Sequence, residues 1–558
     1  MKMKAISAVL FLLIAATVSF AQIDEARAAI QRGEFVRAVN ILTTVLAEQP
    51  SADAYLYLGI AYRNMKEYEK AQELLREGAR RYPDDGRFHS ELANVFLEIN
   101  DIEAARSELE RTLGVDPDNA TASDLLATIN MSEGEVQSAL RWWNKSGRPV
   151  VDDILHNYSL NFGSWVVRKA VAFHPAGVLH YDEWKTTESR LFETDIFANV
   201  GLEVEPTRVT DHYNAVLRTT AKTNTLSDFV FGIVRGAPFH ISFLDFWNIG
   251  NSGVNFNGNY RWDTDRRRVE GSLKIPVPVP GLLHIEIGNT WRKERWDLSP
   301  TILPQFRPAA RFDYKSNGLW IYLKHIPHYR VEIGGGLDYR NRAASGDLPQ
   351  LLTNSENTGR FTLETNLRLV DRRYQNRLHL EAFAARRSIL GDVNFSGGVA
   401  ELNNRFTLSR DPRASFNWTL KGGTSRGQLP VEDYFVLGLD TTTINPLRGH
   451  TVADHGRFGK GPTGTDFILF NSDFDRRLAT LPFFNYVNIP FVAVKWMLFF
   501  DGAKTFDRNR IFQQGKLWLD TGGGLRFETP THSFNVVYGR SLRDGTGVLY
   551  GYVEKRFW

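Results

Sequence analysis

The sequence contains no cysteine among its 558 residues. This absence excludes a disulfide framework, a thiolate metal site and a cysteine nucleophile. An excess of charge of one sign is also missing, because 67 basic and 64 acidic residues leave a formal net charge of +3. Without a broad basic surface, the composition does not indicate a nucleic-acid partner.

Long apolar runs are absent beyond the first 21 residues. A helix that crosses a bilayer needs about 20 mainly apolar residues, so a helical membrane protein is not expected. The chain is instead rich in aromatic residues, at 12%, and in glycine, with 45 residues. This composition is typical of a β-rich protein.

The N-terminal residues have the pattern of an export signal. Lys2 and Lys4 precede an apolar run from Ala5 to Val18, and Ser19-Phe20-Ala21 then forms a small-x-small cleavage site. These features predict a signal peptide over residues 1–21. The next residue, Gln22, is not a cysteine, so the pattern does not predict a lipoprotein.

Residues 22–146 are repetitive. Phe35, Tyr68, Ile102 and Val136 recur at intervals of 33, 34 and 34 residues, and a set of alanines and a set of prolines keep the same step. The pattern resembles tetratricopeptide repeats, in which small residues let paired helices approach closely. We expect an α-solenoid whose aromatic residues pack the core. Asn64 and Asn94, on the inner helices, are the candidate peptide-binding face.

Residues 147–224 change in character. A short extended run at 150–154 precedes a helical stretch near Trp165, an amphipathic segment from Tyr181 to Phe197 and two strands. The order β-α-α-β-β resembles a POTRA domain, the periplasmic α+β module of outer-membrane assembly factors. A POTRA-like periplasmic domain is therefore expected here.

From about residue 226 the apolar period becomes two. Phe361, Leu363, Leu367 and Leu369 alternate with polar residues, and the same pattern recurs to the C-terminus. An apolar face and a polar face fit a lipid-facing barrel with a wet lumen. At about 20 residues per strand and turn, residues 225–558 predict a transmembrane antiparallel β-barrel of about 16 strands.

Two groups of aromatic residues have expected places in this barrel. We expect Trp262, Trp291 and Trp296 at the membrane interfaces, where tryptophan is enriched. The chain ends in a strand-like run with aromatic residues, and this run is the candidate barrel-closing strand. Its named residues are Tyr550, Tyr552, Phe557 and Trp558.

A further motif lies in a long polar segment after Phe435. It contains Arg448-Gly449-His450, and Asp501 follows on a later strand. With the glycine-rich run at 522–524, these residues resemble the BamA-like outer-membrane assembly superfamily, also called bacterial surface antigens. The resemblance implies a lumen loop in which Arg448 pairs with Asp501 and Gly449 allows a tight tip. His450 stands where the family usually has an aromatic residue. On spacing alone, Arg448 could equally be a solvated lumen arginine.

No pattern supports catalysis or a cofactor. The run Gly456 to Gly461 lacks the Ser or Thr of a phosphate loop and is expected to be a flexible loop. His325 and His328 are separated by Ile326-Pro327, which is not a helical metal-binding context. We expect neither an enzyme nor a metal site.

The expected function is that of an outer-membrane barrel that inserts or translocates client proteins. By the resemblance, its N-terminal domains lie in the periplasm and recruit clients or accessory proteins, while outer-membrane lipid surrounds the barrel. Two alternatives stay open: a passive pore or specific solute or lipid transporter, and an envelope scaffold anchored by the barrel. The sequence names neither the client nor the oligomeric state.

Overall fold

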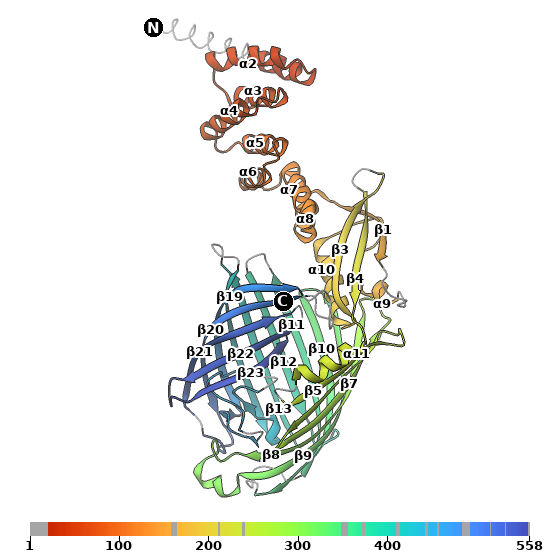
Figure 1. The fold of residues 1–558 in the computed structure, drawn as a ribbon, viewed down its shortest axis with the longest axis vertical. Coiled ribbons are helices and arrows are strands. Elements are labelled where there is room, and N and C mark those ends of the chain that lie inside the picture. Colours follow the sequence, from red (N-terminus) through yellow and green to blue (C-terminus); the bar gives the residue numbers. More distant parts are fainter. Residues whose placement is uncertain are drawn as a thin grey trace. The chain divides into compact units, whose positions relative to one another are not determined.

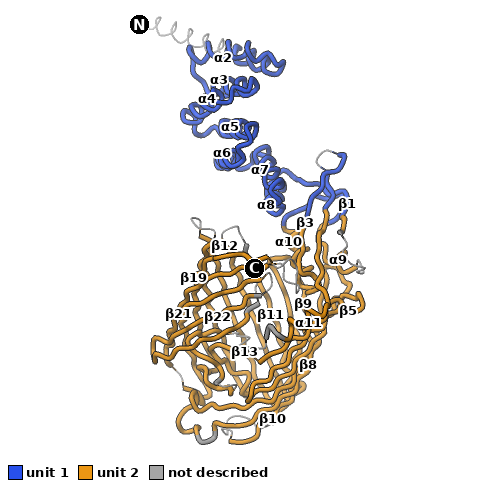
Figure 2. The backbone as a smooth tube through the Cα atoms, in the orientation of Figure 1, with its two compact units in different colours: residues 1–154, 174–181, 202–215 blue, residues 155–173, 182–201, 216–558 orange. Residues whose placement is uncertain are grey.

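The computed structural model describes residues 21–157, 165–209, 212–236, 240–347, 355–370, 374–408, 413–440, 445–454, 457–482, 491–513, 515–529 and 532–555. The chain divides into two compact units, coloured separately in Figure 2. The first comprises residues 1–154, 174–181 and 202–215, and the second comprises residues 155–173, 182–201 and 216–558.

The repeat region is a stack of antiparallel helices (Figure 1). They are α2 (Phe35–Glu48), α3 (Ala52–Asn64), α4 (Tyr68–Arg81), α5 (Arg87–Glu98), α6 (Ile102–Val115), α7 (Ala120–Ser132) and α8 (Val136–Trp143). Small residues at the helix crossings explain the close packing. A Cβ at Gly59 would lie 2.6 Å from the Leu75 side chain, and one at Gly78 would lie 2.2 Å from Phe88. The expected solenoid is thus present over these residues.

A four-stranded sheet in the order β2-β1-β4-β3 follows the repeats. Its elements are β1 (Val150–Asn157), α9 (Trp165–Ala170), β2 (Gly177–Val178), α10 (Tyr181–Glu193), β3 (Phe197–Pro206) and β4 (His212–Ala221). The two-residue strand β2 adds to the expected order. The amphipathic segment also ends earlier than expected, because Asp195 has a positive φ of 59° and turns the chain, so Phe197 begins a strand.

The segment that follows is a helix, α11 (Leu226–Gly236), whereas the alternation from about residue 226 predicted a strand. That expectation was wrong for these residues. Leu226, Phe229 and Ile233 are separated by three and four residues, which is the spacing of one helix face. The first long strand of the barrel begins at Ile241.

The barrel is a closed ladder of strands. Its long strands are β5 (Ile241–Ile249), β6 (Val254–Asp263), β7 (Arg266–Val277), β8 (Leu283–Asp297), β9 (Arg311–His328), β10 (Val331–Gly346), β11 (Ser355–Val370), β12 (Tyr374–Ala385), β13 (Phe395–Thr407), β14 (Ala414–Gly427), β19 (Asp466–Pro482), β20 (Phe491–Phe506), β21 (Leu517–Glu528), β22 (His532–Ser541) and β23 (Gly547–Lys555). The expected transmembrane-type antiparallel barrel of about 16 strands is confirmed as a fold.

The direction of the strands determines the geometry at the junction. Within the described residues, fifteen long strands succeed one another from β5 to β23, and every neighbouring pair along this series is antiparallel. An odd number of alternating strands leaves the first and the last running in the same direction. The ring closes between β23 and β5, so this junction joins two strands of the same direction.

The two faces of the barrel differ as the alternation predicted. Apolar residues such as Leu363 and Leu498 are 63% and 57% exposed on the outer face. Trp291 is also exposed, but Trp296 is buried against Phe312 and Phe458, so its expected place at a membrane interface was wrong. Positions 291 and 296 are five residues apart, and in a strand an odd separation places side chains on opposite faces.

The helices have a separate property. No helix in the part of the chain that the structure describes is long and apolar enough to cross a bilayer.

Candidate functional site: a loop anchored inside the barrel

The segment between β14 and β19, residues 428–465, folds back onto the inner face of the barrel. Its described parts are residues 428–440, 445–454 and 457–465. They include three short strands, β15 (Phe435–Val436), β16 (Ala453–Asp454) and β18 (Thr463–Gly464), and β17 (Arg457–Phe458), which pairs with β8 at Trp296. A barrel of this size encloses a lumen that side chains alone do not fill. The loop therefore occupies space that would otherwise be water.

Arg448 is the most deeply buried charge of the loop. It is 2% exposed, and Asp501 on β20 is fully buried. The Arg448 Nε donates to Asp501 Oδ2 at 2.9 Å, the backbone N–H of Arg448 donates to the same oxygen at 2.9 Å, and Nη2 also pairs with Asp501. Asp473 on β19 pairs with Nη1, and the guanidinium lies 4.0 Å from the ring centroid of Phe499. Such a charge is stable out of water only when it is paired in this way.

The two residues after Arg448 are held by a third aspartate. Asp520 on β21 accepts hydrogen bonds from the backbone N–H of Gly449, at 2.5 Å, and contacts His450 Nδ1 at 3.0 Å. A Cβ at position 449 would lie 2.6 Å from Asp520 Cγ, so glycine is required there. The His450 ring meets the Trp518 ring edge-on, with centroids 4.8 Å apart. The His450 ring thus packs against an aromatic side chain of the barrel wall.

The barrel wall is also shaped for the loop tip. A Cβ at Gly539 on β22 would lie 1.9 Å from the carbonyl oxygen of Arg448. No other residue could occupy this position without moving the loop or the strand. Gly539 therefore lets the backbone of the loop touch the backbone of the wall.

A second anchor lies on another part of the wall. Glu432, in the short helix η4 (Val431–Asp433), contacts Arg292 Nη1 at 3.3 Å, Arg340 Nη1 at 2.9 Å and Arg342 Nε at 2.7 Å. Asp433 contacts Arg342 Nη2 and Arg360 Nη1, each at 3.2 Å. Two carboxylates thus bind four guanidinium groups from β8, β10 and β11.

Two further ion pairs hold the middle of the loop. Asp440 accepts two hydrogen bonds from Arg266, at 3.0 and 3.1 Å, and Arg457 Nε donates to Asp265 at 2.7 Å. These partners lie at the β6–β7 turn, in addition to the walls formed by β8–β11 and β19–β21. Contacts on three parts of the ring make the loop a brace across the lumen.

The other predicted site residues have varied places. Tyr552 on β23 is 1% exposed and packs with Leu439 of the loop, and the Tyr550 hydroxyl lies 3.5 Å from Asp440 Oδ1. Phe557 and Trp558 lie outside the described residues. Asn64 is exposed and donates its amide hydrogen to the Ile60 carbonyl at 2.8 Å. Asn94 is half-buried beside Glu91. The functional roles of these residues stay predictions.

Several residues of this site were not predicted. Asp473, Asp520, Gly539 and the Glu432–Asp433 pair carry no motif of their own. The arginines of β8, β10 and β11 could have indicated acidic partners, because a lumen wall with so many cations requires buried anions. The position of those anions in sequence was not indicated.

Comparison with known proteins identifies the repeat region. Residues 29–94 and 65–129 match the family model described as Tetratricopeptide repeat. This region consists of tetratricopeptide repeats. No curated protein matches the sequence.

Solved structures resemble about three quarters of this chain. CdiB from Escherichia coli matches with a TM-score of 0.52 and 12% identity over 77% of this chain and 86% of that chain. CdiB from Acinetobacter baumannii has a TM-score of 0.47, 11% identity and coverages of 75% and 81%. BamA from Haemophilus ducreyi lacking POTRA domains 1–3 has a TM-score of 0.43, 11% identity and coverages of 73% and 85%. At this identity, the likeness to the first of these structures establishes the fold alone.

Proposed function

We propose that this protein is a bacterial outer-membrane barrel that inserts or translocates client proteins, and that its periplasmic repeats recruit clients or partner proteins. The observation that carries the proposal is the braced loop, with Arg448 bound to Asp501 and Asp473 at its tip. A loop fixed on three parts of the wall closes the lumen while keeping the barrel shape defined. Such a barrel suits the handling of clients at its wall and at its closing junction better than the free diffusion of solutes through its centre.

The outer surface supports the membrane location. Exposed leucine, isoleucine and phenylalanine residues alternate with buried charges along the strands. In water, this apolar belt would drive aggregation, whereas hydrocarbon stabilises it. The polar lumen and the apolar belt together favour a location in a membrane whose proteins cross the bilayer as β-strands.

The repeats support the recruiting role. A tetratricopeptide stack offers an extended concave surface that suits a peptide or a partner protein. Asn64 remains exposed on helix α3, and Asn94 is partly accessible on α5. We propose these two amides as peptide contacts, since amides can donate to and accept from an extended backbone.

A depletion experiment tests this function. Cells depleted of the protein are complemented with the wild type, Arg448→Ala or a variant lacking residues 23–146, and their outer-membrane and secreted proteomes are quantified. An assembly or translocation role predicts that a defined set of barrel or secreted proteins falls on depletion and is not restored by Arg448→Ala. Arg295→Ala is the matched control, because its side chain is 60% exposed and its buried partner Asp265 keeps Arg457 as a second partner.

The alternatives predict different outcomes. A solute or lipid transporter leaves both proteomes unchanged and alters uptake or lipid composition. A scaffold loses its partners when residues 23–146 are removed, while the barrel itself stays inert. Either result would reject the proposed function.

A further inference from the structure

Three basic residues stand side by side on the outer face of the barrel. Arg267 on β7 lies directly opposite Lys293 on β8, and Lys293 lies directly opposite Lys315 on β9. All three residues are exposed. Side chains that are directly opposite on neighbouring strands have Cβ atoms about 5 Å apart, so these positions form one continuous row. We call Arg267, Lys293 and Lys315 the cation row.

The cation row carries positive charge that the protein itself does not balance. Like charges directly opposite each other in a sheet are destabilising. Within the described residues, none of the three forms an ion pair, and Arg267 donates to the Trp262 carbonyl at 2.8 Å. The next row toward the rim differs, because Arg295 lies opposite Asp313 and its Nε is 3.5 Å from the carboxylate. The cation row therefore has a place for an anion from outside the chain.

Other basic residues at this end of the barrel stand alone. The strands β8, β20 and β22 run in the same direction, so their last residues lie at one end of the barrel. Lys504, near the end of β20, lies between Ile468 and Leu517, and Arg540, near the end of β22, has an uncharged residue on each side. A single basic side chain can extend to water from such a position. These isolated cations need no ligand, in contrast to the cation row.

The outward residues of β9 change along the strand in the chemical order of a lipid. Lys315 is followed by Asn317, and then by Leu319 and Ile321, which are 58% and 41% exposed. Trp291 lies opposite Asn317 and is 42% exposed. Tryptophan is enriched at the boundary between headgroups and hydrocarbon, so this level marks the membrane interface. The cation row is thus at headgroup height, with the apolar belt directly below it.

The position of residues 193–195 shows which leaflet the row faces. Lys274, near the other end of β7, donates to Glu193 at 2.7 Å and to Asp195 at 2.8 Å. Residues 193–195 precede the barrel in the chain, on the side that the proposed function assigns to the periplasm. The cation row lies at the opposite end of β7 and hence in the outer leaflet. The inference rests on this part of the proposed function, the location and orientation in the membrane.

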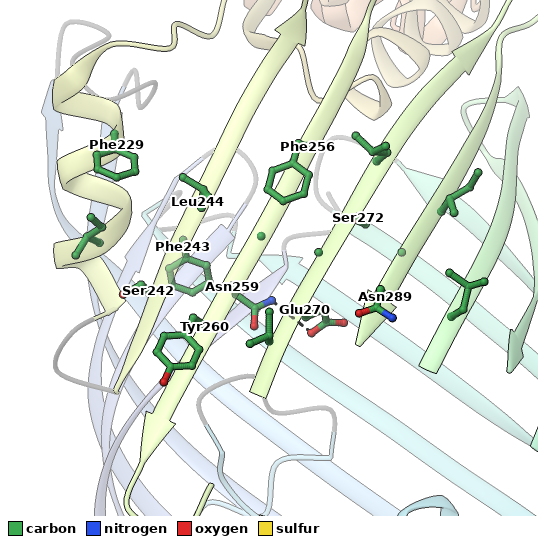
Figure 3. A pocket seen from close by; sticks show the side chains of 18 residues that line it. Phe229, Ser242, Phe243, Leu244, Phe256, Asn259, Tyr260, Glu270, Ser272 and Asn289 are labelled. Atoms are coloured by element: carbon green, nitrogen blue, oxygen red, sulfur yellow. Dashed lines mark hydrogen bonds between the residues drawn. The ribbon is translucent and has the colours of Figure 1, made fainter. Parts of the chain in front are cut away.

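A groove extends from the cation row over the outer faces of β5 to β8 (Figure 3). It has a volume of about 670 Å³, and Val269 and Leu273 are among its lining residues. Gly258 and Gly271, which lie directly opposite each other, also line it and contribute no side chain to fill it. Val269 is two positions from Arg267 on the same face of β7, so the groove and the row are continuous.

We propose that this face binds a phosphorylated lipid of the outer leaflet, with its phosphate on the cation row and an acyl chain in the groove. A phosphate accepts charge-assisted hydrogen bonds from guanidinium and ammonium groups together. Basic clusters beside membrane-spanning segments are general sites for anionic headgroups. The groove selects a lipid over a free anion, because only a lipid has a chain that buries its apolar surface.

The test uses the purified full-length protein in detergent micelles. Native mass spectrometry counts bound lipid while dioleoyl phosphatidic acid is titrated. Dioleoyl phosphatidylcholine is the reference lipid, since it has the same chains and no net charge. Glycerol phosphate, which has the phosphate without the chains, is added as a competitor.

One pair of variants tests the charge. Lys293→Gln/Lys315→Gln removes two charges of the cation row and keeps long polar side chains. Lys504→Gln/Arg540→Gln is the matched control, because it removes two isolated cations at the same end of the barrel. Both proteins lose the same net charge, so only the position of the charges differs.

A second pair of variants tests the groove. Gly271→Leu places a side chain in the groove. Gly422→Leu is its control on the outer face of β14, where the nearest atom is 3.6 Å from the new Cβ. All variants must retain the compact band of the folded barrel on unheated gels.

We expect the wild type to bind one phosphatidic acid more tightly than phosphatidylcholine. Lys293→Gln/Lys315→Gln should weaken phosphatidic acid binding about thirtyfold, which corresponds to about 2 kcal/mol, or about 1 kcal/mol for each lysine. Lys504→Gln/Arg540→Gln should change this binding less than threefold. Gly271→Leu should weaken it more than Gly422→Leu does, and glycerol phosphate should compete poorly.

Three results would overturn the proposal. Equal binding of the two lipids to the wild type would show that the phosphate is not recognised. Equal losses in the two double variants would show that only net charge matters. If Gly271→Leu behaves as Gly422→Leu and glycerol phosphate competes as well as the lipid, the cation row is a site for free anions and the lipid assignment is wrong.

The two proposals fail separately. If the lipid binds at the cation row but depletion leaves both proteomes unchanged, the proposed client role is wrong and the lipid site remains. If depletion removes client proteins but lipid binding is unaffected by the row and the groove, the lipid proposal alone is wrong.

Discussion

Replacing Arg448 with alanine is the most informative single perturbation of the lumen loop. The substitution removes the cation that Asp501 and Asp473 share, and with it the contact to the Phe499 ring. Asp473 keeps Arg526 as a partner at 3.0 Å. Among the described residues, Asp501 keeps hydrogen-bond donors without charge, namely the Asn471 amide at 2.7 Å and the backbone N–H of residue 448.

The expected loss of stability comes from the Asp501 carboxylate, which is left without a charged partner. Asp501 is fully buried, so it cannot recover the lost interaction from water. Removing one partner of a buried ion pair costs about 3–5 kcal/mol, and we expect Arg448→Ala to lower the free energy of unfolding by that amount. Arg448→Lys keeps the charge but loses the forked geometry, so it should fall between the wild type and Arg448→Ala.

The assay is equilibrium unfolding of the purified barrel in urea, followed by tryptophan fluorescence and by the shift of the folded band on unheated gels. Arg295→Ala serves as the exposed control and should cost no more than about 1 kcal/mol. The double variant Arg448→Ala/Asp501→Asn removes the orphaned charge and should recover part of the loss. If Arg448→Ala is no worse than Arg295→Ala, or if the double variant recovers nothing, the reasoning about the buried pair is refuted.

Three further predictions concern the second anchor, the wall and the repeats. Glu432→Gln keeps the shape of the side chain but removes the negative charge that Arg292, Arg340 and Arg342 share. It should lower the stability of the barrel by about 2–3 kcal/mol and raise the single-channel conductance in planar bilayers. Unchanged conductance would contradict the bracing role of the loop. Gly539→Ala should cost about 1–3 kcal/mol in the same urea assay because its Cβ meets the Arg448 carbonyl at 1.9 Å, whereas Gly502→Ala, with 3.6 Å to the nearest atom, should be nearly neutral. Burial raises the pKa of Glu91, although Arg63 opposes this shift. The folded repeats therefore disfavour the charged form of Glu91. They lose stability as the pH rises above the ordinary glutamate pKa. Glu91→Gln should therefore melt at a higher temperature than the wild type at pH 7, by circular dichroism of the full chain, with a gap that narrows as pH falls; a constant gap would exclude this cause.

Local patterns explain why the architecture was predictable from sequence. The step of 33 or 34 residues from Phe35 to Val136 reflects one helix pair per repeat, and each pair packs only on its neighbours. The alternation in strands such as β11 reflects the pleat, which sends successive side chains to opposite faces. Both signals lie within a few tens of residues, so they survive without knowledge of the fold.

The sequence predictions were wrong where residue type suggested one structure or location and the fold adopted another. Residues 226–236 contain phenylalanine, valine and isoleucine, which suit strands, yet the segment is helix α11. Trp296 was assigned to the membrane interface by its residue type, although its register places it against Phe458 in the lumen. In both places the tertiary position, rather than residue preference, determined the outcome.

For the lumen loop, the sequence supplied the residues and a family resemblance, while the structure decided the partners. Arg448 and Asp501 are 53 positions apart, and Glu432 reaches Arg292 across 140. The ring brings such positions together only after it has closed, and a loop of this length can lie against many parts of the wall. Gly539 under the Arg448 carbonyl has no local signature for the same reason. By itself the sequence determined the hydrophobic periods and hence the helices and strands. The tertiary structure decided which distant residues pair, because buried charges and strand edges are satisfied by whichever groups the closed barrel places next to them.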